Sequence, residues 1–394
     1  MLTDDRPCRR ARSHAFVVEH RPHVIHVVHI VTRTNIGGPS VILESLLVDS
    51  SAEVRYTIVR GETDPSEGDY FAESADDRRF ITINGLGRSI SPLADFRAFV
   101  HLVRTLKTLS PDVVHTHMAK AGVVGRLAAW FARVPVRVHT YHGHVLYGYF
   151  SPLKTRLVVL IERLLKLITT HAVVVGSAVR ADLIAARIVS ASRSEMIPPG
   201  IATPRHDTAP DRCGVPLDKL LVGFVGRLVP IKRADRFVDA AKKVTPHRPD
   251  AAFVVVGDGP LGDETRARGA SVPAIHFAGW RRDIAPVLAA LDIMVLCSDN
   301  EGIPLSLIEA SACGVPIVAT RVGSVSDVVT DGVNGILVEP TVDSLAAGIE
   351  KLLADAQLRD GLGTAGKKIA SEKFSISAAQ ERHRTMYRRL VNGD

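Results

Sequence analysis

Cysteine is scarce in this chain. Its four cysteines among 394 residues, Cys8, Cys213, Cys297 and Cys313, lie far apart and form no Cys-x-x-Cys pair. A disulfide framework and a zinc ribbon both need closely spaced cysteines, so this spacing argues against each of them. We therefore expect a protein of a reducing cytoplasm.

Long apolar runs are also missing. No stretch reaches the roughly 18 apolar residues of a membrane span, and the first 23 residues are rich in Arg and His without the apolar run of a signal peptide. We expect neither export nor a membrane crossing. Residues 1–22 are predicted to form a mobile basic tail.

Aromatic residues make up only 5% of the chain, whereas 46% of it is hydrophobic. This composition is typical of a soluble α/β protein and not of a disordered one. A length of 394 residues exceeds what one ordinary core holds, so two domains are expected.

The formal net charge of +7 lies entirely within residues 1–210. No helix-turn-helix, zinc-finger or aromatic RNA-binding signature accompanies it, so nucleic acid is not an expected partner. A basic first half suits anionic lipid head groups or a lipid-diphosphate acceptor, which would make the protein peripheral at the inner face of the membrane. The segment 151–168, with its basic residues among leucines, fits either a helix on a membrane surface or a core helix with solvated ends. Those basic residues are Lys154, Arg156, Arg163 and Lys166.

Strand and helix patterns alternate in two sets. Candidate strands of the first set are residues 23–31, 54–60, 112–115, 136–141, 172–176 and 194–197, with helices such as 92–109 and 119–132 between them. The second set comprises 220–225, 252–256, 274–278, 292–296 and 315–319, followed by helices near 343–371 and 375–390. A Pro- and Gly-rich linker near 199–217 separates them. We predict an α/β fold with two doubly wound domains, residues 23–200 and 201–374.

Residues 299–320 carry the most informative motif. Glu301 follows an apolar strand and Glu309 lies about two turns into the next helix, so both carboxylates can face one ligand. Between them, the free N–H groups of Leu305 and Ser306 at the helix start offer positive charge to a diphosphate. This order suits a nucleotide-sugar site.

The string Glu301-Gly302-x-Pro304-Leu305-x-Leu307-x-Glu309-Ala310, followed by Gly314-x-Pro316-Ile317-Val318-Ala319-Thr320, resembles the retaining glycosyltransferases of family four, the group 1 glycosyltransferases. The resemblance implies the GT-B fold: two Rossmann-like domains facing across a cleft, with the C-terminal helix, 375–394, returning to the first domain. It also implies that Glu301 bonds hydroxyls of the donor sugar and Glu309 those of the ribose, beside Gly302, Ile303, Leu305 and Ser306.

A second motif, Gly226-Arg227-Leu228-Val229-Pro230-Ile231-Lys232, follows the predicted strand 220–225. Two cations five positions apart can close around one diphosphate and offset its charge as the nucleotide departs. We interpret Arg227 and Lys232 as this clamp. The family usually has Gly after this lysine, so Arg233 is expected either to reshape the loop or to add a phosphate contact.

A third string, Gly257-Asp258-Gly259-Pro260-Leu261-Gly262, formally matches a nicotinamide fingerprint. Pro260 lacks the N–H that would cradle a phosphate, and no acidic residue ends the next strand, so we reject this interpretation. The resemblance instead places Gly257 and Gly259 beside the nucleotide base, near Trp280 and Arg281.

The loop Asn35-Ile36-Gly37-Gly38-Pro39 allows a backbone to approach a ligand closely, or forms a plain tight turn. In the family such a loop, here Gly37 and Gly38, faces the donor phosphate and the acceptor. The family also carries an active-site histidine in a Thr-x-His string, which Thr140-Tyr141-His142 matches.

His144 is an alternative to His142, and His117 and Lys120 are expected on the acceptor side by looser analogy. A zinc site at these histidines lacks an acidic partner or thiolate nearby, so no metal is expected.

We therefore expect a glycosyltransferase that moves a hexose-type sugar from a UDP- or GDP-sugar to an acceptor hydroxyl during glycan, polysaccharide or glycolipid assembly. The resemblance implies retention of configuration, and fixed cations would replace a metal. The first domain's loops show no carboxylate pair for double displacement, so we hypothesise front-face attack. Two rivals stay open: a nucleotide-sugar epimerase on the same fold, and a silent nucleotide-sugar-binding protein, which the departures at Ala202, Arg233 and Ser324 keep possible.

Overall fold

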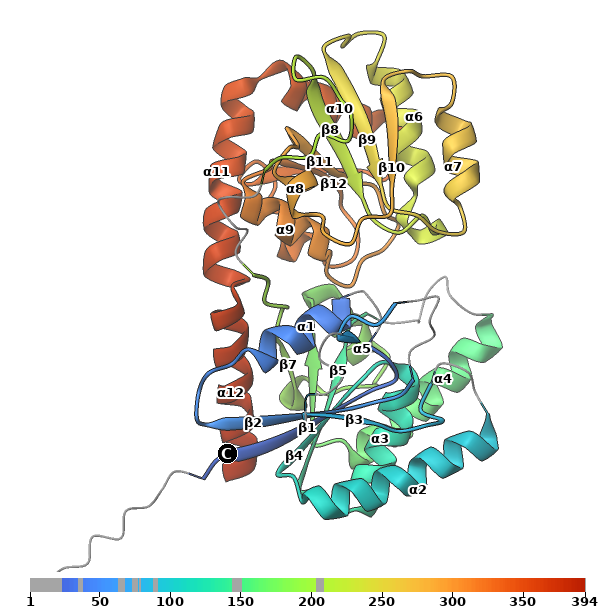
Figure 1. Cartoon of the computed structure of the whole chain (residues 1–394), viewed down its shortest axis with the longest axis vertical. Coiled ribbons are helices and arrows are strands. Elements are labelled where there is room, and N and C mark those ends of the chain that lie inside the picture. Colours follow the sequence, from blue (N-terminus) through green and yellow to red (C-terminus); the bar gives the residue numbers. More distant parts are fainter. Residues whose placement is uncertain are drawn as a thin grey trace, which may run out of the picture.

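The computed structural model describes residues 23–34, 38–62, 68–72, 77, 79–87, 91–143, 151–202 and 209–393. Figure 1 shows two lobes, one above the other, and a long helical segment that runs along one side of both. Each lobe is built around its own parallel sheet.

The first sheet has seven strands in the order β3-β2-β1-β4-β5-β6-β7. Its central strands β1 and β4 are buried at every position, because helices cover both faces of a parallel sheet. The strands are β1 (Ile25–Val31), β2 (Val54–Arg60), β3 (Phe80–Thr82), β4 (Val113–His117), β5 (Val136–Tyr141), β6 (His171–Val174) and β7 (Ser194–Met196).

Helices lie on both faces of this sheet. Right-handed crossovers put α2 (Pro92–Leu109), α3 (Ala119–Phe131), α4 (Pro152–Leu165) and α5 (Ser177–Ala185) on one face. The other face is covered by α1 (Gly38–Leu47) and by the last helix of the chain, α12 (Ile376–Asn392), which contact one another.

The second sheet has six strands in the order β10-β9-β8-β11-β12-β13. They are β8 (Leu220–Val225), β9 (Ala251–Val256), β10 (Ile275–Gly279), β11 (Ile293–Leu296), β12 (Ile317–Thr320) and β13 (Gly335–Val338). The helices around them are α6 (Ala234–Val244), α7 (Gly262–Gly269), α8 (Ala285–Leu288), α9 (Leu305–Cys313), α10 (Val342–Ala354) and α11 (Ala356–Lys373).

Helix α12 leaves the second lobe and docks on the first. Met386 and Tyr387 lie in one apolar cluster with Val27, Val113 and Val138 of the first sheet. The Gln380 side-chain amide donates to the Ser45 carbonyl at 2.7 Å, and Arg384 pairs with Asp49 at 2.8 Å. The C-terminal helix is therefore part of the first lobe's core.

The predicted fold class is confirmed, and several elements agree residue for residue: β2, β5, β8 and α2. Two strands, β3 and β13, were missed. None of the described helices is long and apolar enough to cross a bilayer.

Candidate active site between the two sheets

Both sheets have the strand order of a Rossmann fold, in which ligands bind outside the carboxyl ends of the strands where the order reverses. In the second sheet this point lies between β8 and β11. The predicted Gly226–Lys232 and Glu301 segments follow these two strands. The topology therefore brings the two sequence motifs to one edge.

The carboxyl ends of the two sheets meet. A Cβ atom at Gly302, after β11, would lie only 2.5 Å from the carbonyl oxygen of His142, after β5. Nearby, the backbone N–H and hydroxyl of Ser177 both donate to Asp327 at 2.6 Å. His142 and Gly302 thus face each other across the domain boundary, with no room for a side chain at Gly302.

Lys232 and Glu301 form the centre of the second-domain site. The Lys232 ammonium lies 2.7 Å from Glu301 Oε1, which also accepts the Ser298 hydroxyl at 2.5 Å. Only 8% of the Glu301 side chain is exposed. A carboxylate at this depth needs a counter-ion to stay charged, and Lys232 supplies it.

The loop that carries Glu301 is held in place by hydrogen bonds on two sides. The buried Arg236 of α6 donates to the Cys297 carbonyl at 2.6 Å and to Asp299 at 2.7 Å. On the opposite side, Ser324 N–H donates to the Glu301 carbonyl at 3.1 Å. Ser298 and Arg236, which the sequence analysis missed, therefore hold the loop and orient the carboxylate.

Arg233 occupies the position where the family usually has glycine, and it keeps the glycine-like backbone. Its φ and ψ of 52° and 45° are left-handed, which side chains other than glycine adopt reluctantly. Its guanidinium donates to Asp235 at 2.9 Å and pairs with Asp299 at 3.2 Å. The loop keeps its turn, and Arg233 points to carboxylates.

The glycines of the rejected fingerprint have a packing role. A Cβ atom at Gly257 would lie 2.0 Å from the Gly226 carbonyl, and one at Gly259 would lie 2.6 Å from the Leu228 carbonyl. Gly257 also has a φ of 130°, which favours glycine. Because they lack side chains, both glycines allow the loop after β9 to pack closely against the backbone that precedes Lys232.

Glu309 lies in the second turn of α9 and is half-buried. Burial raises the pKa of its carboxyl group to about 7. Burial also raises the pKa of Tyr70 in the first domain, and the carboxylates of Glu44 and Glu309 raise it further. The Tyr70 hydroxyl donates to Glu44 at 2.5 Å. Because Glu309 affects the pKa of Tyr70, the Tyr70–Glu44 pair of the first domain lies on the Glu309 side of the site, and the sequence analysis missed it.

Other predicted residues lie around the same edge. The side chain of Arg227 is exposed and has no hydrogen-bond or ion-pair partner among the described residues. Trp280 and Arg281 are exposed after β10, Ile303 is half-buried, and Leu305 and Ser306 begin α9. No hydrogen bond or ion pair among the described residues joins Arg227 or Glu309 to the Lys232–Glu301 pair. Gly38 begins α1, whereas Gly37 and His144 lie outside the described residues.

The first-domain histidines form a hydrogen-bonded chain. His142 Nε2 lies 3.1 Å from His117 Nδ1, and His117 Nε2 lies 2.8 Å from His29 Nδ1. His117 is buried, and both of its ring nitrogens are hydrogen-bonded to other histidines. It therefore lies behind His142, whereas we expected it on the acceptor side. Lys120 is also held inward, paired with Asp95 at 2.5 Å and bonded to the Gly85 carbonyl.

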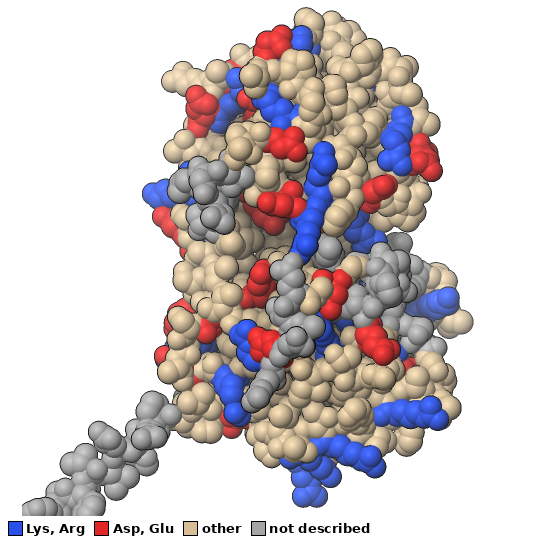
Figure 2. Space-filling view, viewed as in Figure 1, with Lys and Arg blue, Asp and Glu red and all other residues tan. Residues whose placement is uncertain are grey.

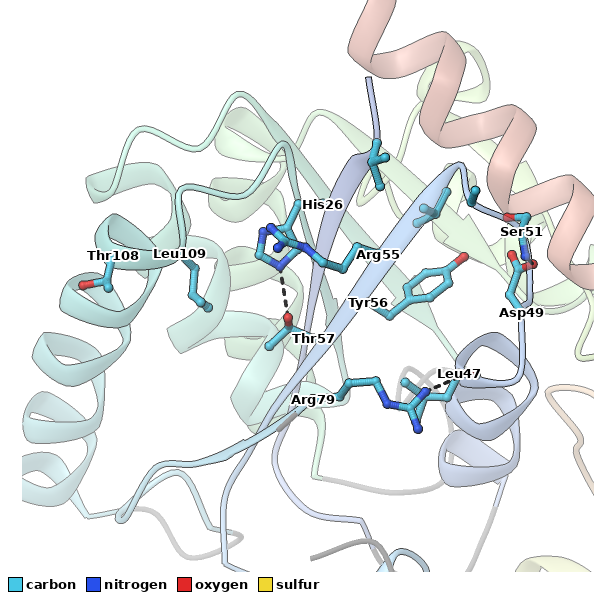
Figure 3. Close-up of a pocket in the computed structure, with 13 residues that line it drawn as sticks. His26, Leu47, Asp49, Ser51, Arg55, Tyr56, Thr57, Arg79, Thr108 and Leu109 are labelled. Atoms are coloured by element: carbon cyan, nitrogen blue, oxygen red, sulfur yellow. Dashed lines mark hydrogen bonds between the residues drawn. The ribbon is translucent and has the colours of Figure 1, made fainter. Parts of the chain in front are cut away.

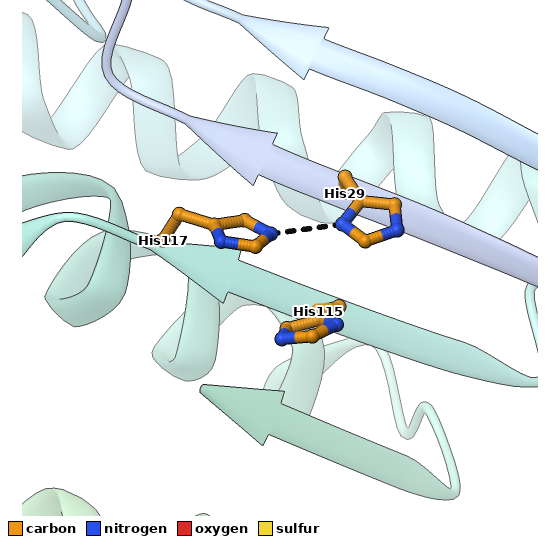
Figure 4. Close-up of side chains that lie close together, drawn as sticks. All are labelled: His29, His115 and His117. Atoms are coloured by element: carbon orange, nitrogen blue, oxygen red, sulfur yellow. Dashed lines mark hydrogen bonds between the residues drawn. The ribbon is translucent and has the colours of Figure 1, made fainter. Parts of the chain in front are cut away.

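His29, His115 and His117 lie close enough together to suggest a metal site (Figure 4). However, the His115 and His117 rings are stacked 4.5 Å apart, so their lone pairs run side by side and do not converge. His115 also has both nitrogens bonded, to Thr140 at 2.6 Å and Tyr387 at 2.7 Å. We interpret the cluster as a hydrogen-bonded network.

A pocket of about 700 Å³ opens elsewhere, at the amino ends of β1 and β2 (Figure 3). His26, Arg55, Tyr56 and Thr57 line it, and the His26 ring is bonded to the Thr57 hydroxyl at 3.0 Å. None of the site residues described above lines it, and it lies at the opposite end of the strands. We therefore place the site at the carboxyl ends.

Comparison with known proteins identifies the family. Residues 37–200 match the profile of the glycosyl transferase 4-like domain, and residues 219–355 match that of the glycosyl transferases group 1. A D-inositol 3-phosphate glycosyltransferase of Xylanimonas cellulosilytica is 33% identical over 298 residues, which cover 68% of this chain and 69% of that protein. The chain belongs to the group 1 glycosyltransferases.

This glycosyltransferase is also similar to a UDP-Gal:alpha-D-GlcNAc-diphosphoundecaprenol alpha-1,3-galactosyltransferase of Escherichia coli, with 29% identity over 82% of this chain and 86% of that enzyme. Among solved structures, Anabaena Alr3699/HepE in complex with UDP and glucose covers 92% of this chain and 99% of its own, with a TM-score of 0.76 and 22% identity. The expected family and enzyme class are confirmed, and the structural likeness supports the GT-B fold.

Arg233 generates a stability prediction. Arg233→Gly should be more stable than Arg233→Ala by ~1 kcal/mol, because both lose the same surface ion pairs and only glycine relieves the left-handed backbone. Urea unfolding of the two variants measures this difference. Arg233→Gly should also keep its turnover, and a large loss would mean that the guanidinium contacts the donor.

Proposed function

We propose that this glycosyltransferase moves a hexose-type sugar from a nucleoside diphosphate sugar to an acceptor hydroxyl in glycan, polysaccharide or glycolipid assembly. The Escherichia coli relative uses UDP-Gal, and the Anabaena structure holds UDP, so a UDP-sugar is the first donor to test and a GDP-sugar the second. The acceptor is proposed to be a lipid-linked glycan, by analogy with the diphosphoundecaprenol named for the same relative.

The Lys232–Glu301 pair carries this proposal. The Lys232 ammonium and the Glu301 carboxylate neutralise one another's charge at 2.7 Å. A nucleotide sugar would give both residues a new partner. Its diphosphate would pair with the Lys232 ammonium, and its sugar hydroxyls would donate to the Glu301 carboxylate. The exposed Arg227 would add a second cation to the diphosphate.

The mechanism follows from these assignments. Charge grows on the β-phosphate as the bond to the sugar breaks, and Lys232, Arg227 and the N–H groups at the start of α9 stabilise it without a metal ion. His142 would bond the donor sugar from the first domain. We propose front-face attack by the acceptor, with the leaving phosphate accepting its proton, and hence retention of configuration.

The first test removes the pair. Lys232→Met should lower kcat by at least ~100-fold, since it removes a cation from the leaving group. It also leaves Glu301 buried without a counter-ion and should destabilise the fold, whereas Lys232→Met/Glu301→Gln should restore stability but not turnover. Sugar transfer from UDP- and GDP-hexoses and thermal unfolding measure the two effects.

Several outcomes would contradict the proposal. Normal transfer by Lys232→Met would refute the leaving-group role. Isomerised donor in the absence of acceptor would favour the epimerase, and donor binding without transfer or hydrolysis would favour a silent binding protein. Loss of transfer in EDTA, or an inverted product by NMR, would refute metal independence or retention.

The raised pKa of Glu309 predicts a pH dependence. If its carboxylate accepts two ribose hydroxyls, only the ionised form binds well, and ionisation increases as the pH rises through about 7. Affinity for UDP-glucose should therefore increase about tenfold between about pH 6 and pH 8, as the ionised fraction does. Calorimetry with UDP-glucose suits this test, because its phosphates carry no proton that titrates in that range.

Glu309→Gln is the matched control, and its affinity should be low and independent of pH. Burial lowers the pKa of His142 to about 4, so His142 does not titrate in the same range. An unchanged pH dependence in Glu309→Gln would contradict the assignment.

We also propose that the first domain works at an anionic membrane surface, through α4. This helix is fixed to the core by its inward Glu162, which accepts two bonds from the buried Arg126 at 2.9 Å and one from the Tyr141 hydroxyl at 2.7 Å. Its outward side carries Leu153, Leu157, Leu160 and Leu164, and Leu167 lies in the 3-10 turn Lys166–Ile168 that follows. All five leucines are more than half exposed and lie at spacings of four and three residues. Such spacing forms one apolar stripe along a helix.

Charge around the stripe favours an anionic membrane as the partner. Lys154, Arg156 and Arg163 are exposed beside the leucines, and the helix's single acidic residue, Glu162, faces inward. Figure 2 shows further Lys and Arg side chains along the lower edge of this lobe, over α2, without acidic neighbours in that view. A second copy docked on the stripe would bring like charges together, whereas anionic head groups attract them.

Vesicle co-sedimentation tests this surface. The protein should bind phosphatidylglycerol vesicles more tightly than phosphatidylcholine vesicles, and Leu160→Gln/Leu164→Gln should weaken binding by ~10-fold or more, because apolar area no longer enters the bilayer. Leu217→Gln, at an exposed leucine of the second domain, is the control and should bind normally. Equal vesicle binding by the two variants would refute the membrane assignment. So would a dimer of the wild-type protein that the Leu217→Gln variant still forms and the Leu160→Gln/Leu164→Gln variant does not.

A further inference from the structure

The chain of three histidines in the first domain ends on a nitrogen atom that has no partner within the described part of the chain. His142 Nε2 faces His117 Nδ1, and His117 Nε2 faces His29 Nδ1, at 3.1 and 2.8 Å. The remaining ring nitrogen of His29, Nε2, is buried and makes no hydrogen bond to any residue that the structure describes. This hydrogen-bonded chain therefore ends inside the core at His29 of β1, and its other end is His142 at the domain boundary.

All three rings are neutral near pH 7. Burial lowers the pKa of His142 to about 4, that of His29 to about 3, and that of His117 well below its usual value. Each neutral ring has one N–H donor and one lone pair. Because His117 must donate to one neighbour and accept from the other, both hydrogen bonds run in the same direction along the chain.

The two directions differ in what they leave at His29. If His142 donates first, the last proton lies on His29 Nε2, where a buried N–H has no acceptor. If His29 donates first, from Nδ1, only a lone pair is left at Nε2. Buried N–H groups without a partner are rarer in proteins than acceptors with unused lone pairs, so the second direction is favoured.

We propose that His29 is a positioning residue that donates to His117, and that His117 in turn donates to His142, so that His142 is held as its Nδ1–H tautomer. Given the proposed role of His142, that N–H is a hydrogen-bond donor for an oxygen of the donor sugar or of its leaving phosphate. The opposite tautomer would present a lone pair there, which cannot stabilise negative charge. The tautomer of an active-site ring is thus set two residues away, on strand β1.

The packing around the chain favours one fixed arrangement. His115 stacks on His117 at 4.5 Å, and its own nitrogens are bonded to Thr140 and Tyr387. His117 therefore cannot turn its ring toward His115 for another partner. Tyr387 belongs to α12, so the C-terminal helix also supports this arrangement.

Nitrogen-15 NMR of histidine-labelled protein at neutral pH tests the tautomer directly. The His142 signals, identified by their loss in His142→Gln, should report a proton on Nδ1 and a bare Nε2 that accepts a hydrogen bond. A proton on His142 Nε2 would overturn the proposal. This measurement uses the wild-type protein without ligand, so it does not depend on the function of His142.

Two variants of His29 test the positioning role. An Asn side chain places its amide N–H near the position of the His29 Nδ1–H, so His29→Asn should keep the wild-type tautomer and turnover. His29→Leu removes the donor, so His142 should shift toward the Nε2–H form and kcat should fall ~10-fold with little change in the KM for donor. Equal kcat values for the two variants, or a kcat loss in His29→Leu without a tautomer shift, would overturn the role. Full turnover by His142→Ala would instead refute the proposed function of His142, and the NMR result would stand by itself.

Discussion

The ion pair between Lys232 and Glu301 is the interaction on which the arrangement of the site depends. Glu301 lies at the boundary between two lobes, with almost none of its side chain exposed, so its charge would be unfavourable without a cation at hydrogen-bond distance. Lys232 provides that cation from the neighbouring strand's loop. The need for a nearby cation also explains the hydrogen bonds around the loop. Ser298, Arg236 and Ser324 make these bonds and hold Glu301 within reach of Lys232.

The two lobes contribute different chemistry to their common edge. The second lobe offers charge: cations, a carboxylate pair and the N–H groups at the start of α9. The first lobe offers neutral rings, since burial keeps His29, His117 and His142 uncharged. A positive charge next to a departing diphosphate attracts it, whereas a neutral donor can orient a sugar without binding the phosphate in its place. This division suits a reaction in which the sugar must leave the nucleotide.

Much of the fold could be predicted, because both sheets are parallel and buried and their strands are continuous apolar runs. The short strands β3 and β13 were not predicted. In the site, the positions of Glu301 and Lys232 followed from their place after strands. The inward orientation of His117 and Lys120 did not, since a residue at a strand end or a helix start can face either way until its neighbours are known. His29 was hidden within an apolar strand, and Arg236 lay in an ordinary amphipathic helix.

Local patterns and strand–loop–helix spacing were enough to predict the family, the α/β architecture with two sheets and the positions of the Lys232 and Glu301 motifs after their strands. The groups that meet could be identified only from the folded chain: Lys232 with Glu301, His142 with Gly302, and His29 with His117. These contacts join residues that are far apart in the chain, and their distances depend on how two sheets pack and how α12 returns. Pairing, burial and the resulting shifts in pKa are properties of that packing, and no segment contains them alone.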